Sequence, residues 1–256
     1  MKWSRVRIVL MIILGFSPLL PAQDTEHSAT LSDKPTISAQ DLSGVWIQAS
    51  AVSIQWFDSQ GNRLKDLPMT PWAETKFKAN SPTHGPNEVS SVLSTDPIAK
   101  CLPPGVPSIY MMTFPMEIVQ IPGRVIMFFE YDHYVRQIFT DGRPHQNLTP
   151  TWMGDSIGKW QGDSFVIDTN GFNDKTWIDN EGHPHSDALH VIERIRRIDH
   201  QTMEDDINLE DPKAYTTTLT TKRILTLKAG WNIVEYICED NDTFLEYQKT
   251  ATEGNK

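Results

Sequence analysis

Short apolar runs, separated by turn-forming residues, recur at regular spacing through most of this chain. From Met116 onward, runs rich in Val, Ile, Phe and Thr alternate with turn signals such as Pro122–Gly123, Asp141–Gly142 and Gly162–Asp163. Such pairs between strand-like runs favour β-hairpins, and there is no strand–helix alternation that would indicate a parallel α/β fold. The sequence therefore predicts an all-β chain of roughly 8–10 antiparallel strands, arranged as a closed barrel or a sandwich, and we expect the barrel.

Two stretches depart from this pattern. Thr70 is a good N-cap, and Pro71 suits the first position of a helix. With Glu74 in the first turn, one short helix is expected to run to about Ala79. The segment CLPPGVP, residues 101–107, holds three prolines that exclude both a helix and a central strand, so we expect a rigid loop near the barrel rim.

The start of the chain has the layout of a secretory signal peptide. Basic residues precede the apolar run Ile8–Phe16, and Ala22 supplies a small residue at a plausible cleavage point. The apolar run is shorter than the about 20 residues that a membrane-spanning helix needs, although an uncleaved anchor is the alternative. An exported protein, periplasmic or extracellular, is therefore expected. The chain divides into four parts: a signal peptide at 1–22, a disordered leader at 23–40, a single barrel domain at 41–248 and a flexible tail at 249–256.

Charge and cysteine content limit the partners and the covalent structure. The chain has 23 basic and 33 acidic residues and a formal net charge of −10. This balance argues against nucleic acid, and against a membrane after signal cleavage, because both attract basic patches. A monomer or a weak homo-oligomer is expected. The two cysteines, Cys101 and Cys238, predict a disulfide in an exported protein, and two buried free thiols are the alternative.

A histidine cluster invites a metal interpretation. His183, His185 and His190 follow one another within eight residues, with Glu193 beyond them. However, Pro184 stiffens the first pair, and the three histidines span a junction between a loop and a strand. We therefore expect no metal site, and we interpret His183 as an exposed loop residue. A metal-dependent enzyme that uses His183, His185 and His190 remains an alternative.

Acid–base catalysis is the leading interpretation of the same region. His185 and His190 would be general base and acid, because the unperturbed pKa of histidine lies nearest neutral pH. Asp155 or Glu193 would orient them, and Tyr131 would polarise the substrate. His190 and Glu193 fall on opposite faces of the strand expected from 188 to 198, so only one of them can face the barrel interior. A structural ion pair at the barrel mouth is the plainer explanation.

Aromatic and basic residues elsewhere are candidates for binding the substrate. Aromatic side chains with a polar handle suit the wall of a ligand pocket, although core packing is the alternative. No glycine-rich phosphate-binding motif is present, so no organic cofactor is expected. The expected partner is a small apolar or aromatic molecule. The candidate substrate-binding residues are Arg136, His133, Trp152, Trp177 and Phe129.

Seven short motifs lie along the chain: DLSGVW at 41–46, CLPPGVP at 101–107, EYDH at 130–133, TDGRPH at 140–145, TWMGDSIG at 151–158, GFND at 171–174 and PHSDALH at 184–190. Together they resemble a large family of exported, mostly uncharacterised bacterial proteins that are lipocalin-like. The resemblance covers nearly all of the chain after the leader and implies a shared barrel of lipocalin or calycin type with a shared polar site, but no reaction. From the acid–base residues we expect an enzyme of lyase, isomerase or hydratase type, and a non-catalytic carrier of lipocalin type is the alternative.

Overall fold

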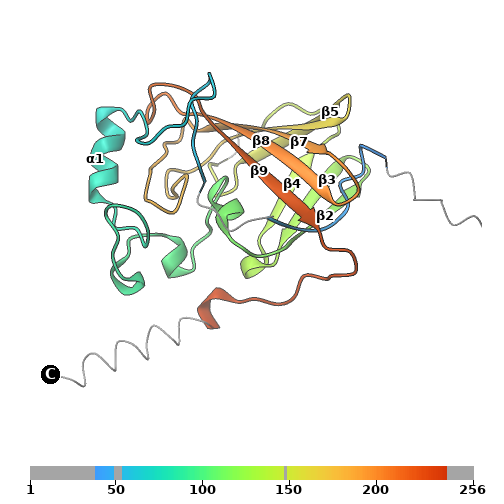
Figure 1. The fold of residues 1–256 in the computed structure, drawn as a ribbon, viewed down its shortest axis with the longest axis horizontal. Coiled ribbons are helices and arrows are strands. Elements are labelled where there is room, and N and C mark those ends of the chain that lie inside the picture. The colour runs from blue at the N-terminus through green and yellow to red at the C-terminus, as the bar shows by residue number, and fades with distance from the viewer. Residues whose placement is uncertain (1–37, 49–53, 147–148, 241–256) are drawn as a thin grey trace, which may run out of the picture. The chain divides into compact units, whose positions relative to one another are not determined.

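The computed structural model describes residues 38–48, 54–146 and 149–240, and this part of the chain forms a closed barrel of nine strands (Figure 1). Each strand pairs with the next one in the sequence, and the first closes on the last. The prediction of an all-β barrel is confirmed. The strands are β1 (Gly44–Gln48), β2 (Met116–Ile121), β3 (Arg124–Phe129), β4 (Val135–Phe139), β5 (Asp155–Gln161), β6 (Ser164–Asn170), β7 (His190–Arg197), β8 (Thr202–Glu210) and β9 (Leu219–Leu227).

One strand pair departs from the expected antiparallel order. β4 and β5 run parallel, with Ile138 opposite Ser156 and Phe139 opposite Ile157. Parallel neighbours cannot be joined by a tight hairpin, because the chain must first return to the end of the sheet at which the first strand begins. The segment 140–154 makes this return, so the turn signal at Asp141–Gly142 begins a long connection and not a hairpin.

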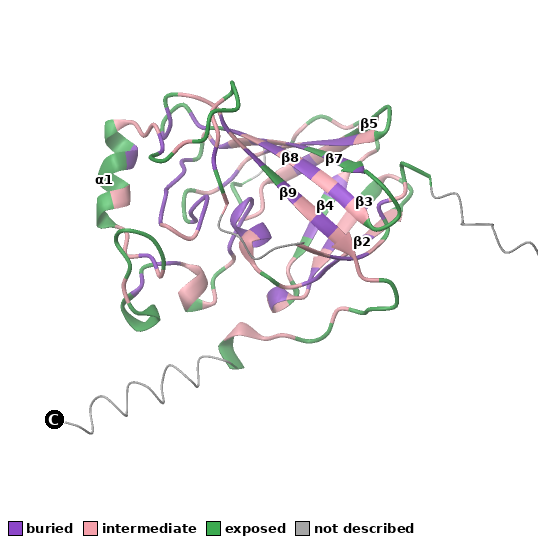
Figure 2. Ribbon diagram, viewed as in Figure 1, coloured by how far each residue is buried: buried purple, intermediate pink, exposed green. Residues whose placement is uncertain are grey.

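Buried and less buried residues alternate along the strands (Figure 2), so one face of each strand fills the barrel interior. On β8, for example, Met203, Asp205, Ile207 and Leu209 are buried while the residues between them are only partly buried. Each large apolar side chain buried in this way contributes about 1.5–3 kcal/mol to folding. Trp46 of the opening motif is fully buried and donates from Nε1 to the carbonyl oxygen of Leu42 at 2.9 Å.

Helix α1 (Pro71–Ala79) lies outside the barrel (Figure 1) and confirms the predicted helix. Thr70 accepts a hydrogen bond from the backbone N–H of Ala73 at 3.3 Å, which is the expected N-cap contact. Four short 3-10 turns and the helical residues 238–240 complete the helical structure of the described residues. The turns are η1 (Ser91–Leu93), η2 (Ile98–Lys100), η3 (Ser108–Met111) and η4 (Tyr131–His133).

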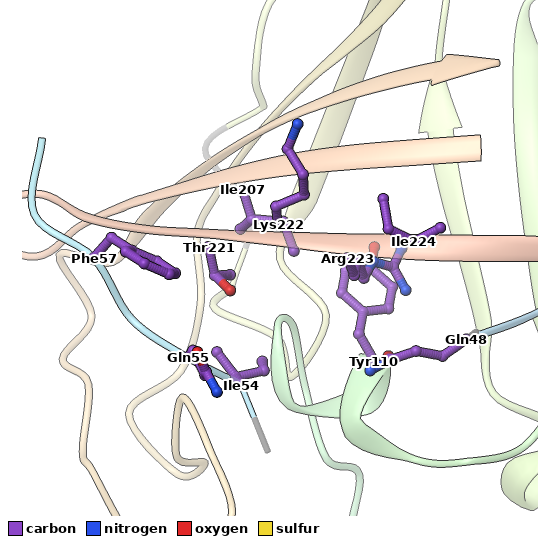
Figure 3. A pocket seen from close by; sticks show the side chains of 10 residues that line it. All are labelled: Gln48, Ile54, Gln55, Phe57, Tyr110, Ile207, Thr221, Lys222, Arg223 and Ile224. Atoms are coloured by element: carbon purple, nitrogen blue, oxygen red, sulfur yellow. The ribbon is translucent and has the colours of Figure 1, made fainter. Parts of the chain in front are cut away.

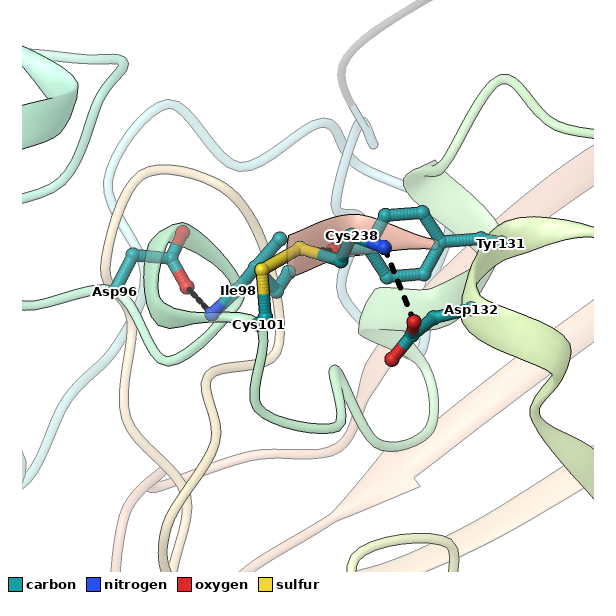
Figure 4. The surroundings of a disulfide bond; sticks show 6 residues. All are labelled: Asp96, Ile98, Cys101, Tyr131, Asp132 and Cys238. Carbon is teal, nitrogen blue, oxygen red and sulfur yellow. Dashed lines mark hydrogen bonds between the residues drawn. A yellow bond between two sulfur atoms is a disulfide. The ribbon is translucent and has the colours of Figure 1, made fainter. Parts of the chain in front are cut away.

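A disulfide joins the proline-rich loop to the chain after β9 (Figure 4). Cys101 and Cys238 are bonded, with their Cα atoms 5.5 Å apart, so the predicted disulfide is confirmed. The sequence after the turn at Ala229–Gly230 favours a strand over 231–239, but the structure has no strand in these residues. Their backbone N–H groups instead reach side chains: Val234 donates to Glu130 at 3.0 Å, and Cys238 donates to Asp132 at 3.1 Å.

The structure does not describe the two ends of the chain. The predicted signal peptide at 1–22, most of the predicted leader at 23–40 and the predicted tail at 249–256 fall outside the described residues. Among the residues that are described, no helix has both the length and the apolar character to span a membrane.

Candidate functional site

A histidine and an aspartate of the loop between β6 and β7 form a hydrogen-bonded pair. Nδ1 of His183 lies 2.7 Å from Oδ2 of Asp179. Because an ionised carboxylate can only accept, this contact favours the tautomer in which Nδ1 carries the proton and Nε2 keeps its lone pair. The imidazole also stacks on Phe77 of α1, with ring centroids 4.5 Å apart and planes 11° apart. These two contacts fix both the tautomer and the orientation of the ring.

Asp179 is itself held by four hydrogen bonds. Its Oδ1 accepts from the backbone N–H groups of Glu181 at 3.0 Å and His183 at 3.2 Å. Its Oδ2 accepts from His183 and, at 3.2 Å, from Nε1 of Trp56. Aspartate commonly bonds the backbone two residues ahead in a turn, which is the local reason for this geometry. The carboxylate cannot rotate away from His183 without breaking these bonds.

The pair borders a cavity of about 680 Å³. The segment 54–67 forms one wall, and the loop that carries Asp179 and His183 forms the other. Nε2 of His183 has no hydrogen-bond partner among the described residues and is not one of their enclosed, unpaired polar atoms. This nitrogen is therefore available to a molecule in the cavity. The other lining residues are Ile54, Gln55, Trp56, Arg63, Leu64, Lys65, Leu67 and Glu181.

His185, two residues farther on, has no free nitrogen. Its Nε2 lies 2.6 Å from Oγ1 of Thr176, and its Nδ1 lies 3.0 Å from the carbonyl oxygen of Ser186. Only 1% of the residue is exposed, and this burial lowers the pKa of the imidazole. The ring thus stays neutral, and both nitrogens are used to hold the loop. As placed here, His185 cannot act as the predicted general base.

His190 and Asp155 belong to a group on the outside of the barrel. Nε2 of His190 lies 2.8 Å from Oδ1 of Asp168, and the same oxygen lies 3.0 Å from Nε2 of His145. Nδ1 of His145 lies 3.1 Å from Oδ2 of Asp155. The group links the connection after β4 to β5, β6 and β7. Asp155 therefore orients His145, a residue that the sequence interpretation did not select.

Glu193 lies on the opposite face of β7, inside the barrel. Its two oxygens receive Nη1 of Arg136 at 3.0 Å and Nη2 at 2.5 Å, and Tyr110 of η3 donates to it at 2.7 Å. Arg136 also donates to Tyr110, to Ser156 at 3.2 Å and to Thr169 at 2.8 Å. Burial would raise the pKa of Glu193, but the charge and hydrogen bonds of Arg136 hold it below its ordinary value. Glu193 is an ionised and fully bonded carboxylate, so no free base remains there.

The predicted site residues near β3 and η4 lie away from this network or serve the core. Tyr131 packs beside the disulfide, where its hydroxyl lies 3.4 Å from Sγ of Cys238 (Figure 4). Phe129 is buried, and its ring centroid lies 6.1 Å from that of Tyr110. His133 is exposed. None of the three predicted residues lines the cavity beside His183.

The two predicted tryptophans also lie outside that cavity. Trp152 is half-buried, and Nζ of Lys175 lies 5.6 Å from its ring centroid. Trp177 is buried, and its carbonyl oxygen accepts from the hydroxyl of Ser108 at 2.5 Å. Both are therefore accounted for by contacts within the fold.

The structure thus brings only some of the predicted residues together. Arg136 and Glu193 share the interior, whereas His185, His190 and Asp155 occupy two other places. The interpretation of His183 as exposed is wrong, because the hydrogen bond to Asp179 and the stacking on Phe77 compensate its burial. Asp179 was not selected. The Asp-x-x-x-His spacing was a usable signal only with knowledge of the turn between the two residues.

Metal ligation has no support in the described residues. They contain no group of three or more His, Cys, Asp or Glu side chains that could hold a metal ion. His183, His185 and His190 have separate partners, as described above.

Comparison with known proteins assigns no family. No protein-family model matches this chain, and no curated protein sequence matches it either.

Proposed function

We propose that this protein is an exported enzyme that moves protons on a small apolar or aromatic molecule held in the cavity beside His183. The observation that carries the proposal is the free Nε2 of His183, a residue that Asp179 holds in place and that lines a cavity of about 680 Å³. Aspartate holds catalytic histidines in this same way in enzymes that use a histidine base. His183 would be the catalytic base, and Asp179 a positioning residue.

Part of the cavity wall supports the proposed substrate class. Ile54, Trp56, Leu64 and Leu67 give an apolar and aromatic region, and the other six lining residues are polar or charged. The apolar region suits the body of an apolar or aromatic molecule, and the polar residues would set its orientation. The reaction would be of lyase, isomerase or hydratase type, in which a base removes one proton and its conjugate acid returns it elsewhere. The predicted signal peptide and the disulfide support export.

A probe substrate tests the base directly. 5-Nitrobenzisoxazole is a flat aromatic molecule whose opening needs only a base. Nε2 of His183 takes the ring C–H proton, the C–H electron pair completes the nitrile, and the N–O bond breaks to release a coloured nitrophenolate. The wild-type protein should open the probe about 100-fold faster than the His183→Gln variant, the lower end of what a positioned base contributes.

Two further variants complete the test. Asp179→Asn should lower kcat at least about 10-fold with little change in KM, because the amide no longer enforces the productive tautomer. His200→Gln is the matched control, since His200 is exposed and lines neither wall of the cavity. Its rate should equal that of the wild-type protein. Equal rates for His183→Gln and the wild-type protein, with both folded by circular dichroism, would overturn the proposal.

A further inference from the structure

A second buried arginine of the barrel has hydrogen bonds to spare. Arg223 of β9 is 8% exposed, and Nε donates to Oδ2 of Asp205 at 2.8 Å. Its Nη2 is buried with no hydrogen-bond partner, and so is Oδ1 of Asp205. In the described part of the chain, the guanidinium makes no other hydrogen bond. Nη2 is enclosed, but Nη1 is not, so Nη1 is the nitrogen that a molecule beside Arg223 can reach. The N–H groups of a buried charged side chain are rarely left unpaired, so this geometry points to a ligand.

Arg223 lines a cavity of about 400 Å³ (Figure 3). The Cζ atom of Arg223 lies 3.4 Å from the ring centroid of Tyr110, which covers one face of the guanidinium. Figure 3 shows these two side chains at one end of the cavity and Phe57 toward the other. Ile54 and Ile207 add apolar wall. Lys222 also lines the cavity, but its Nζ pairs with Glu204 at 3.3 Å and with Asp206 at 3.2 Å. The positive group of Arg223 beside apolar and aromatic walls matches a small molecule with one acidic group and an apolar body.

We propose that this cavity binds a small monocarboxylate whose carboxylate accepts hydrogen bonds from Arg223, and that Asp205 takes up a proton as the ligand binds. The site is distinct from the cavity beside His183, with which it shares only Ile54 and Gln55 as lining residues. It does not depend on the proposed reaction.

The charges around Asp205 explain why it takes up a proton when the ligand binds. Glu193 of β7, Arg136 of β4 and Arg223 face it inside the barrel, together with the phenol of Tyr110. Two positive and two negative groups balance, so an added carboxylate leaves an excess negative charge. Burial raises the pKa of Asp205 to about 6, which makes it the group that protonates most readily. Once neutral, Asp205 no longer competes with the ligand for Arg223.

Calorimetry with phenylacetate and its neutral analogue phenylacetamide tests the proposal. Phenylacetate should bind at least about 10-fold more tightly than phenylacetamide at pH 6, since a charged acceptor bonds arginine more strongly than a neutral one. Its affinity should fall by up to about 10-fold for each pH unit between pH 6.5 and pH 8, where Asp205 must take up a proton to allow binding. Equal affinities for the two probes would overturn the site.

Variants distinguish the effect of a lost charge on binding from the effect of a disturbed fold. Asp205→Asn should keep phenylacetate binding and lose its pH dependence. The double variant Asp205→Asn/Arg223→Gln removes both charges without leaving one unpaired, and it should lose the preference for phenylacetate. Arg143→Gln, on the surface, is the control for a lost positive charge and should bind as the wild-type protein does. Retained preference in the folded double variant, or retained pH dependence in Asp205→Asn, would contradict the assignment.

Discussion

Two arginine–carboxylate pairs lie in the same barrel interior and differ in how completely they are bonded. Arg136 meets both oxygens of Glu193, and its remaining hydrogen bonds go to Tyr110 and to two hydroxyl groups. Arg223 meets Asp205 through one hydrogen bond and leaves Nη2 without a partner. The first pair has no capacity left for a ligand, whereas the second has.

Burial does not explain this difference, because both carboxylates are fully buried. Burial acts to raise the pKa of each acid, but the pKa of Glu193 ends below its ordinary value and that of Asp205 is raised to about 6. The surrounding charges and hydrogen bonds decide the outcome. The charge and the hydrogen bonds of Arg136 favour the ionised form of Glu193, whereas the nearby charge of Glu193 opposes ionisation of Asp205. A buried ion pair whose hydrogen bonds are all made thus has a structural role. A pair with hydrogen bonds left unmade can respond to pH or to a ligand.

The largest expected effect comes from breaking the saturated pair. Arg136→Met leaves Glu193 buried without its cation and should reduce the free energy of unfolding by about 3–5 kcal/mol. Chemical denaturation at pH 7 measures this loss. Arg143→Met is the matched control, because Arg143 pairs with Asp141 at 2.5 Å on the surface and exposed pairs contribute little. Similar losses of unfolding free energy in both variants would show that the interior network contributes no more to stability than the surface pair.

The fold could be predicted because its signals are local. Alternating apolar residues and turn pairs mark the strands, and the cap at Thr70 marks the helix within a few residues. The parallel contact of β4 and β5 could not be predicted, because the direction of return depends on how the connection 140–154 packs. The strand expected over 231–239 fails for a similar reason, since its N–H groups find the side chains of Glu130 and Asp132.

The candidate site was harder to predict because its partners are distant in the sequence. Arg136 and Glu193 are 57 residues apart, and only the register of the strands brings them together. Alternation on β7 showed that His190 and Glu193 face opposite ways but not which one faces inward. Asp179 and His183 are close in sequence, yet their contact depends on a turn that the residue types alone do not define.

A second, smaller effect is the pH dependence of the free energy of unfolding that Asp205 contributes. The pKa of Asp205 is raised from 3.8 to about 6, so the folded state holds a proton that the unfolded state has released. Stability from this group is full below about pH 4 and is lost as the pH rises to about 6. The loss is on the order of 2–3 kcal/mol, at about 1.4 kcal/mol per pH unit. Denaturation of the wild-type protein and Asp205→Asn at several pH values measures it, and parallel curves would contradict the prediction.

The smallest effect is expected when the unsaturated pair is neutralised as a unit. Asp205→Asn/Arg223→Gln should change the free energy of unfolding at pH 7 by less than about 1 kcal/mol, because removing both charges also removes their desolvation cost. The same exchange in the saturated pair, Glu193→Gln/Arg136→Gln, should cost at least about 3 kcal/mol, since Tyr110 and the hydroxyl groups lose charged partners. Denaturation of both double variants under one set of conditions compares them directly. Equal costs would mean that the spare hydrogen bonds of Arg223 are no different in kind from the bonds of Arg136.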